Sequence, residues 1–283
     1  MIKHAIKNKL FIGCEVSDHE FDNLPMCKGC ALGKIVRRKF PKKATKRNLI
    51  FLEVVSFDIA TITKPCSAGG HKYFIIFVDH MCNWKWVYCL QQRHHAMDAI
   101  KKFEKEAARA SGCKIGTLRC DGEFYHKNAY REWCLEEGIR TEYSVPYSSA
   151  QNGKAERAIR TVVEAARTAL VHSRMPKNWY WAVKWLVYTI NRLPTKSNKD
   201  WVSPYHMRWG APAQIQHLRP FGCEVVVCLQ VPEELPRGHT FHQRGVDGYF
   251  LGYPGGIKSF TVMVRSTGRI VTRRNVIFNE TAI

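Results

Sequence analysis

The order of hydrophobic and polar residues predicts alternating strands and helices through the centre of the chain. Three apolar segments come first, and the second, residues 73–78, is hydrophobic almost throughout, as a buried strand is. We expect these three to form an antiparallel meander. The predicted elements are strands at 49–57, 73–78 and 84–90, a helix at 96–110, a strand at 115–120, a helix at 125–137, a strand at 140–145, a helix carrying Glu156, and a helix at 179–192. This order predicts an α/β core over residues 48–192.

The helix that carries Glu156 begins after the turn signal Asn152-Gly153. Six apolar residues then recur at helical spacing and predict a buried stripe: Ile159, Val162, Val163, Ala166, Ala169 and Leu170. Glu156 falls at the edge of this stripe, with Arg157 and Arg160 on the solvent side. Such a carboxylate can point into a site while its helix stays anchored. The alternative is a first-turn glutamate favoured only by the helix dipole.

Both ends of the chain differ from this core. Residues 1–47 are polar and contain Cys27 and Cys30 in a CxxC turn, whose two thiolates can reach one zinc ion. No histidine pair that would complete the site is recognisable upstream, so we interpret this segment as a truncated zinc-type module; two ordinary free cysteines are the alternative. Residues 193–220 form a proline-containing connector. Short strands punctuated by glycine at 223–229, 248–252, 259–264 and 269–278 predict a small β-barrel-like module over 221–283.

The strongly positive charge of the chain indicates which class of molecule it binds. The formal net charge of +20 over 283 residues predicts a polyanionic partner, with nucleic acid as the first candidate. The basic linker before the core contributes Arg37, Arg38, Lys42 and Lys43, which we expect to contact phosphates. No apolar run approaches the roughly 20 residues that span a bilayer, so a membrane is not the expected partner. No secretory signal is visible, so the 11 cysteines are interpreted as reduced thiols of an intracellular protein.

Three acidic residues suggest a reaction centre. Asp58 and Asp121 each follow a predicted strand directly, and Glu156 opens a helix. Carboxylates that converge repel one another, so a cluster of this kind needs cations, and hard oxygen ligands suit Mg²⁺ or Mn²⁺. Two such ions could activate a water or a 3′ hydroxyl for displacement at phosphorus. For any single aspartate at a strand end the alternative is a turn or cap residue, and we expect that role for Asp79.

The three acids and the residues around them resemble the integrases of copia-type retrotransposons. Residues 118–124 are similar to the strand with the second aspartate, and residues 145–157 are similar to the glutamate motif. Further similar segments lie at 27–34, 191–194, 218–223 and 250–253, so the resemblance covers nearly the whole chain. One departure is Asp121-Gly122-Glu123, which is shorter than the Asp-Asn-Gly-Gly-Glu usual in the family.

The resemblance implies a ribonuclease-H-like mixed sheet with flanking helices and a polynucleotidyl transferase that joins element DNA ends to target DNA. It implies that Asp58, Asp121 and Glu156 hold Mg²⁺ or Mn²⁺, and that Lys154, Arg157 and Arg160 hold phosphates beside them. It also implies a homo-oligomer that works in the nucleus when it acts on chromosomal DNA. The alternatives are a non-catalytic nucleic-acid-binding remnant and a nuclease that only hydrolyses.

Overall fold

The computed structural model describes residues 8, 28–34, 49–62, 69–144, 152–229, 243–255 and 258–280. The chain divides into two units, Met1–Lys46 and Arg47–Ile283. In the first unit the described element is the helix α3 (Lys28–Lys34), which begins between the two cysteines of the CxxC turn. Cys27, the side chain of Cys30 and the four predicted phosphate contacts of the basic linker (Arg37, Arg38, Lys42 and Lys43) lie outside the described residues.

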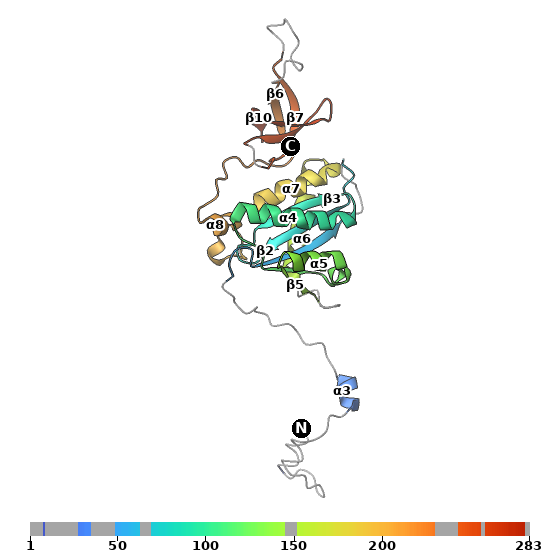
Figure 1. Cartoon of the computed structure of the whole chain (residues 1–283). Helices are drawn as coiled ribbons and strands as arrows, with labels where there is room; N and C mark the ends of the chain where they lie inside the picture. Colours follow the sequence, from blue (N-terminus) through green and yellow to red (C-terminus); the bar gives the residue numbers. More distant parts are fainter. Residues whose placement is uncertain are drawn as a thin grey trace. The chain divides into compact units, whose positions relative to one another are not determined.

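The second unit is built on a five-stranded mixed sheet with the strand order β3-β2-β1-β4-β5 (Figure 1). The strands β1 (Val54–Thr61), β2 (Tyr73–Asp79) and β3 (Lys85–Leu90) form the predicted antiparallel meander. The strands β4 (Thr117–Cys120) and β5 (Arg140–Tyr143) continue the sheet on the other side of β1, parallel to it. The predicted mixed sheet in an α/β fold is therefore confirmed.

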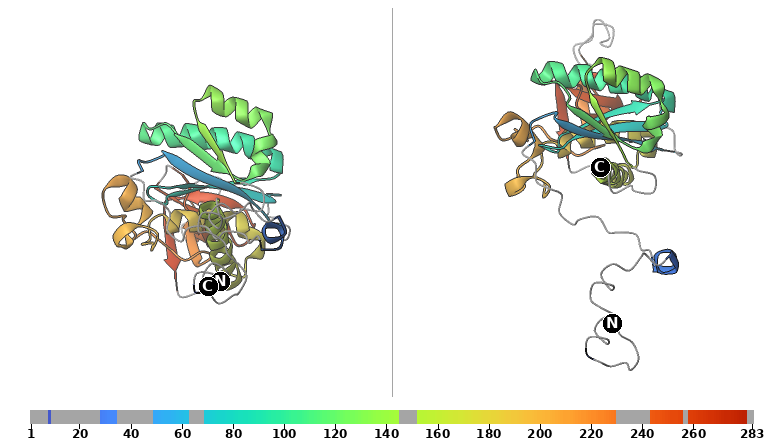
Figure 2. Two further views of the ribbon diagram at one scale, coloured as in Figure 1. Left: turned by 90° about the horizontal axis from the view of Figure 1, so that it is seen from below. Right: turned by 60° about the horizontal axis from the view of Figure 1, so that its bottom comes forward.

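Helices cover both faces of this sheet (Figure 2). One face carries α4 (Ala96–Ser111) and α5 (Asn128–Glu136), and the other carries α6 (Gly153–His172) and α7 (Trp179–Ile190). The strand β2 contributes to both layers because its successive side chains point to opposite faces. Phe77 stacks on Phe103 of α4 with ring centroids 4.0 Å apart, whereas Phe74 contacts Trp179 of α7. This explains why the sequence of β2 is hydrophobic almost throughout.

The first strand differs from its prediction in a way that matters for the site. The strand was expected to end before Asp58, but β1 runs to Thr61, so Asp58 lies inside it, opposite Ile76 of β2. Residues 51–53 form a turn instead, with Leu52 at a φ of 64°. The register explains how a strand tolerates the aspartate. The strand β4 pairs only with Val54 to Ser56, so β1 is open on that side where Asp58 lies.

The connector also contains helical structure that the pattern did not predict. A 3₁₀ turn, η5 (Lys199–Trp201), precedes the short helix α8 (Pro204–Trp209). The hydroxyl of Ser203 caps α8 by accepting from the backbone N–H of His206 at 3.1 Å, and Gly210 ends it at a φ of 71°. Six residues are too few to show a helical repeat, so cap chemistry was the only available signal.

Buried polar side chains fasten the core sheet in two places, at the turns around Asp79 and at the edge strand β3. The carboxylate of Asp79 is fully buried and accepts from the backbone N–H groups of Leu52 at 2.9 Å and Cys82 at 2.8 Å. This is the turn role predicted for Asp79. At the edge strand β3, the amide of Asn191 pairs with both backbone groups of Lys85, at 2.9 and 2.7 Å, and so imitates a neighbouring strand.

The C-terminal region forms a second antiparallel sheet with the strand order β10-β6-β7-β8-β9. Its strands are β6 (Glu224–Cys228), β7 (Gly245–Gly252), β8 (Phe260–Val264), β9 (Ile270–Arg273) and β10 (Val276–Asn279). Within the described residues β9 and β10 do not pair, so the sheet is not a closed barrel. The strand predicted at 269–278 is two strands, interrupted between Arg273 and Val276.

This second sheet packs on α7, and the segment that leads into it passes close to the end of α6. The indole of Trp185 donates to the carbonyl of Arg219 at 3.0 Å, and its ring contacts Phe221. Gly222 adopts a φ of 76°, and a Cβ there would lie 2.2 Å from that of Ser173. Only glycine meets both demands. The tryptophan was predicted to be a core residue, and it packs against the hydrophobic core.

The buried Asp79 gives a stability prediction. Replacing Asp79 with alanine leaves the backbone N–H groups of Leu52 and Cys82 without their acceptor. We expect the free energy of unfolding, measured by urea titration, to fall by about 2–4 kcal/mol. Asp98→Ala, which removes an exposed acid from the first turn of α4, is the control and should cost less than about 1 kcal/mol. An equal loss of unfolding free energy in the two variants would show that the buried hydrogen bonds of Asp79 do not stabilise the fold more than an exposed acid does.

Candidate active site

Asp58 is the most buried acid of the predicted triad. It lies on the central strand β1, and its Oδ1 accepts from the backbone N–H of Ile59 at 2.8 Å. Burial, followed by the charges of Asp121, Glu156 and Glu123, raises the pKa of Asp58 to about 6, although the Ile59 hydrogen bond opposes the shift. A carboxylate with a raised pKa lacks a compensating positive charge. The position of Asp58 therefore suits a cation.

Asp121 lies at the same edge of the sheet, directly after β4. It caps the 3₁₀ turn η2 (Gly122–His126), and its Oδ1 accepts from Gly122 N–H at 2.6 Å and from the Ser144 hydroxyl at 3.0 Å. A Cβ on Gly122 would approach the carbonyl of Ser144 to 3.1 Å, so the turn is tight enough to favour glycine. The shortened Asp121-Gly122-Glu123 segment thus forms a regular cap, and it holds the carboxylate toward β5.

Glu156 lies in the first turn of α6 and is exposed. The buried stripe of α6 is Ala155, Ala158, Val162 and Ala166, so it includes smaller residues than the predicted stripe. The predicted stripe overlaps at Val162 and Ala166, whereas Ile159, Val163, Ala169 and Leu170 are only partly buried and flank the contact. Small residues let α6 approach the sheet closely.

The start of α6 is tied to the strand that carries Asp58. The side chain of Asn152, which is 2% exposed, donates to the carbonyl of Phe57 at 3.0 Å. Phe57 immediately precedes Asp58, and Asn152 lies one helical turn before Glu156, whose N–H bonds to the Asn152 carbonyl at 3.3 Å. One side chain therefore links the backbones of two predicted metal ligands. The sequence pattern identified Asn152 only as a turn signal and missed this contact.

The three acids influence one another but do not form a finished metal site. Asp121 and Glu156 both raise the pKa of Asp58, so their charges act at its carboxylate. Within the part of the chain that the structure describes, however, no group of three or more His, Cys, Asp or Glu is arranged to hold a metal ion. The Asp121 carboxylate is instead engaged by the backbone N–H of Gly122 and the hydroxyl of Ser144.

The donor set nevertheless fits a hard divalent ion. Asp58, Asp121 and Glu156 offer carboxylate oxygens, which Mg²⁺ and Mn²⁺ prefer. A fourth acid, Glu123, also acts on Asp58. Although burial raises the pKa of Glu123, hydrogen bonds from Arg93 and from Lys127, the latter at 2.9 Å, lower it below its usual value. Glu123 is thus already paired with Arg93 and Lys127. No motif in the sequence predicted these two partners.

The basic residues of α6 fall into two groups. Arg157 and Arg160 are exposed, as a phosphate contact requires. Lys154 is partly buried and donates to the carbonyl of His80 at 3.0 Å, and burial lowers its pKa to about 8. Its ammonium thus also holds α6 against the turn after β2. The phosphate contacts predicted for all three residues stay predictions, as does the zinc pair Cys27 and Cys30.

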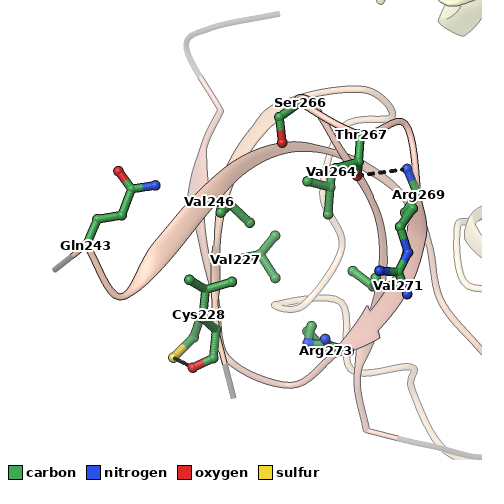
Figure 3. Close-up of a pocket in the computed structure, with 11 residues that line it drawn as sticks. Val227, Cys228, Gln243, Val246, Val264, Ser266, Thr267, Arg269, Val271 and Arg273 are labelled. Carbon is green, nitrogen blue, oxygen red and sulfur yellow. Dashed lines mark hydrogen bonds between the residues drawn. The ribbon is translucent and has the colours of Figure 1, made fainter. Parts of the chain in front are cut away.

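A pocket in the C-terminal sheet is unrelated to these acids. It has a volume of about 430 Å³ and is lined by valines of four strands, including Val227 and Val264, with Arg269 and Arg273 at its side (Figure 3). None of its lining side chains is acidic, so it offers no carboxylate ligands.

Comparisons with known proteins find similar sequences in the polyproteins of transposons. It is 30% identical over 259 residues, 91% of its length, to the retrovirus-related Pol polyprotein from transposon TNT 1-94 of Nicotiana tabacum. It is also 30% identical over 257 residues to the Pol polyprotein from transposon RE2 of Arabidopsis thaliana, and 25% identical to the Ty1-LR3 Gag-Pol polyprotein of Saccharomyces cerevisiae. The chain is homologous to Pol polyproteins of copia-type retrotransposons. It spans 19% and 17% of the two plant polyproteins.

Two further findings agree with this similarity. Residues 223–283 match the retroviral polymerase SH3-like domain, which covers the second sheet. A chain of the simian T-cell lymphotropic virus intasome, solved in complex with PP2A regulatory subunit B56 gamma, aligns with a TM-score of 0.51. That alignment covers 98% of this chain and 96% of the viral chain at 14% identity, so it shows a shared fold. The family resemblance predicted from the motifs is confirmed.

The raised pKa of Asp58 predicts a pH-dependent stability. The folded state binds this proton more tightly than the unfolded state, whose pKa is near 3.8. Without metal, the charged carboxylate therefore destabilises the fold progressively from about pH 4 through pH 6. Asp58→Asn should raise the free energy of unfolding at pH 7.5 by about 1–3 kcal/mol, and the gain should vanish near pH 4. Urea titrations in a chelating buffer measure this difference.

The control for this measurement is Glu164→Gln. Glu164 is an exposed acid on α6, about two helical turns after Glu156. Its effect should be small at both pH values. A gain for Asp58→Asn that is the same at pH 4 and pH 7.5 would contradict the assigned cause, because the effect would then not depend on ionisation.

Proposed function

We propose that this chain is the integrase segment of a copia-type retrotransposon, a divalent-metal-dependent polynucleotidyl transferase that joins element DNA ends to target DNA. Its core would be ribonuclease-H-like, in keeping with the strand order β3-β2-β1-β4-β5. The observation that carries the proposal is the partly buried Asp58 carboxylate, whose pKa is raised by burial and then by the charges of Asp121 and Glu156 from the neighbouring strand end and helix. A structural cap needs no such gathering of like charges.

Each residue has a role that follows from its position. A divalent ion, when bound, would polarise the phosphodiester and favour ionisation of the attacking 3′ hydroxyl. Asp58 would be the shared ligand because it lies on the central strand, with Asp121 and Glu156 on either side. Asn152 would set the separation of Asp58 and Glu156 through its bond to Phe57. Ser144 would orient the Asp121 carboxylate by donating to Oδ1. Arg157 and Arg160 would hold backbone phosphates beside the acids.

The partners follow from charge and from the relatives. The net charge of +20 supports DNA as the partner. The similar viral chain comes from an intasome, and by analogy we propose that this chain also acts as a homo-oligomer on DNA. Action on chromosomal DNA would place it in the nucleus. Zinc at Cys27 and Cys30 is kept as part of the proposal, in a module whose histidine half is not recognisable. No helix within the described residues has the length and hydrophobicity to cross a membrane.

One observation favours the second candidate, a non-catalytic nucleic-acid-binding remnant. The Asp121 carboxylate is engaged by hydrogen bonds within a turn that is shorter than the family's. Active sites tolerate little displacement, since about 1 Å can cost on the order of 10²-fold in rate. The two candidates differ only in turnover, so an activity measurement decides between them.

Strand transfer is the deciding experiment. Labelled element ends are incubated with target DNA in Mg²⁺ or Mn²⁺, and joined products are counted. Asp58→Asn, Asp121→Asn and Glu156→Gln should each reduce joining by at least about 10³-fold, because each removes a charged ligand. Glu164→Gln on α6 and Glu136→Gln on α5 keep the triad intact and should retain most of the activity.

The shortened turn supplies the second half of this experiment. If the native chain binds DNA but joins none, insertion of asparagine and glycine after Asp121 should restore activity by restoring the family's spacing. Failure of both the native and the repaired chain, with DNA binding preserved, would favour the remnant. Joining by the triad variants would contradict the assigned ligands.

Salt dependence tests the phosphate contacts on α6. Each neutralised phosphate releases counterions, so log affinity should fall steeply and linearly with log salt concentration. Arg157→Ala and Arg160→Ala should each reduce the steepness of the log affinity versus log salt plot by about one. Each should weaken binding to all DNA sequences alike, as measured by anisotropy of labelled duplexes. Lys154→Ala should instead lower the free energy of unfolding, since its ammonium bonds to the His80 carbonyl. An unchanged slope in the double arginine variant would place the phosphates elsewhere.

A further inference from the structure

Two tryptophans of the connector are exposed to solvent. Trp201 is 57% and Trp209 is 51% exposed. The other six tryptophans of the chain are buried or half-buried in the two sheets and their helices: Trp84, Trp86, Trp133, Trp179, Trp181 and Trp185. The two exposed rings lie only eight positions apart, in η5 and α8. Large exposed rings that gather on one short segment are typical of binding surfaces.

The loop that carries Trp201 is firmly anchored to the core. Asn198, which is 7% exposed, accepts from the Asn83 amide at 2.6 Å and donates to the carbonyls of Cys82 and Val202 at 3.1 and 2.9 Å. These bonds hold both sides of the η5 turn. The exposure of Trp201 is therefore not the result of a loosely attached loop.

The backbone beneath Trp201 is unusual. Asp200 has a φ of 52° and Trp201 a φ of 58°, in the left-handed region that bulky side chains rarely adopt. Such conformations are energetically unfavourable and persist where the surroundings impose them. Here they turn a large apolar ring outward instead of burying it. Stability alone does not explain this arrangement, because the ring gains no burial in return.

Each exposed ring is accompanied by a cation. The ammonium of Lys196 lies 5.0 Å from the ring centre of Trp201, and the guanidinium of Arg208 lies 4.5 Å from that of Trp209. Arg208 also lies over Phe51 and Trp84, each at 4.7 Å, so Trp209 is fixed to the core through it. Asp200 is the single acid between residues 191 and 217, against the bases Arg192, Lys196, Lys199 and Arg208. Aromatic rings with flanking cations combine base stacking with phosphate binding.

We propose that Trp201 and Trp209 form a stacking platform for the unpaired bases of single-stranded nucleic acid, with the exposed Lys196 and Lys199 facing its phosphates. Three residues of extended chain and five of helix separate the two rings' backbones by at most about 18 Å. A strand of a few nucleotides can therefore reach both. The local excess of basic residues favours nucleic acid over an apolar or basic protein partner. This inference shares a nucleic-acid partner with the proposed function but requires neither catalysis nor metal.

The test measures single-strand binding in the absence of turnover. Anisotropy of a labelled oligothymidine and of a duplex of equal length is recorded in chelating buffer, with every variant built on Asp58→Asn. Trp201→Ala with Trp209→Ala should weaken binding of the single strand by at least about 30-fold, because both stacking rings are lost. Affinity for the duplex should change by less than about twofold. Phenylalanine at both positions should retain most of the single-strand affinity.

Controls separate stacking from folding and from charge. Tyr125→Ala removes another exposed ring that has a cation above it, from Arg131 at 5.3 Å, and should leave single-strand affinity unchanged. Trp201→Ala alone should fold normally, as judged by urea titration, because its ring is more than half exposed. It should still weaken single-strand binding severalfold.

Three results would overturn the proposal. An unchanged single-strand affinity would exclude stacking at these rings. Equal losses for the single strand and the duplex would show a general effect on phosphate binding. Unchanged DNA binding with a changed oligomeric state would assign the surface to protein contacts. A failure of strand transfer, by contrast, bears only on the proposed function, since binding here is measured on a chain without turnover.

Discussion

The site depends on holding three acids, Asp58, Asp121 and Glu156, near one another on separate elements. Burial and the charges of the neighbouring acids raise the pKa of Asp58, so its charged form is costly in this position. The fold bears this cost by fixing the backbone at each acid: β1 continues past its parallel neighbour at Asp58, η2 caps itself with Asp121, and Asn152 joins α6 to the carbonyl next to Asp58. Helix α6 can approach because its contact residues are mostly alanine. Removing any of these supports would let electrostatic repulsion separate the acids.

Much of the fold was accessible from the sequence, because it depends on patterns longer than a turn. The continuous hydrophobicity of β2, the stripe of α6 and the glycine after α5 identified elements that the structure contains. The failures occurred where a local contact outweighs the pattern. Asp58 was expected to end its strand, but a polar residue is tolerated there because β4 stops pairing at Ser56. Helix α8 is too short to show periodicity, and β9 and β10 are separated by only two residues.

The candidate site was predictable as a set of residue types but not as a geometry. The motifs identified Asp58, Asp121 and Glu156, and their mutual effect on the pKa of Asp58 agrees with proximity. The supporting residues could not be identified in the same way. Ser144 and Asn152 act through single hydrogen bonds across 23 and 95 residues of sequence, and Arg93 pairs with Glu123 across 30. No spacing rule reports contacts of this kind, because they depend on the register of the assembled sheet.

The pairing of Asn191 with Lys85 has a consequence for biosynthesis. Strand β3 is an edge of the central sheet, and its unpaired backbone would be a template for association with other chains. The side chain that covers its beginning is encoded 106 residues later. At a synthesis rate of about 5–20 residues per second, the nascent sheet waits roughly 5–20 seconds for that cover. During this interval the incomplete chain has an unpaired edge strand. Where several ribosomes translate the same mRNA, neighbouring nascent chains could pair through this edge, and misassembly would then compete with folding.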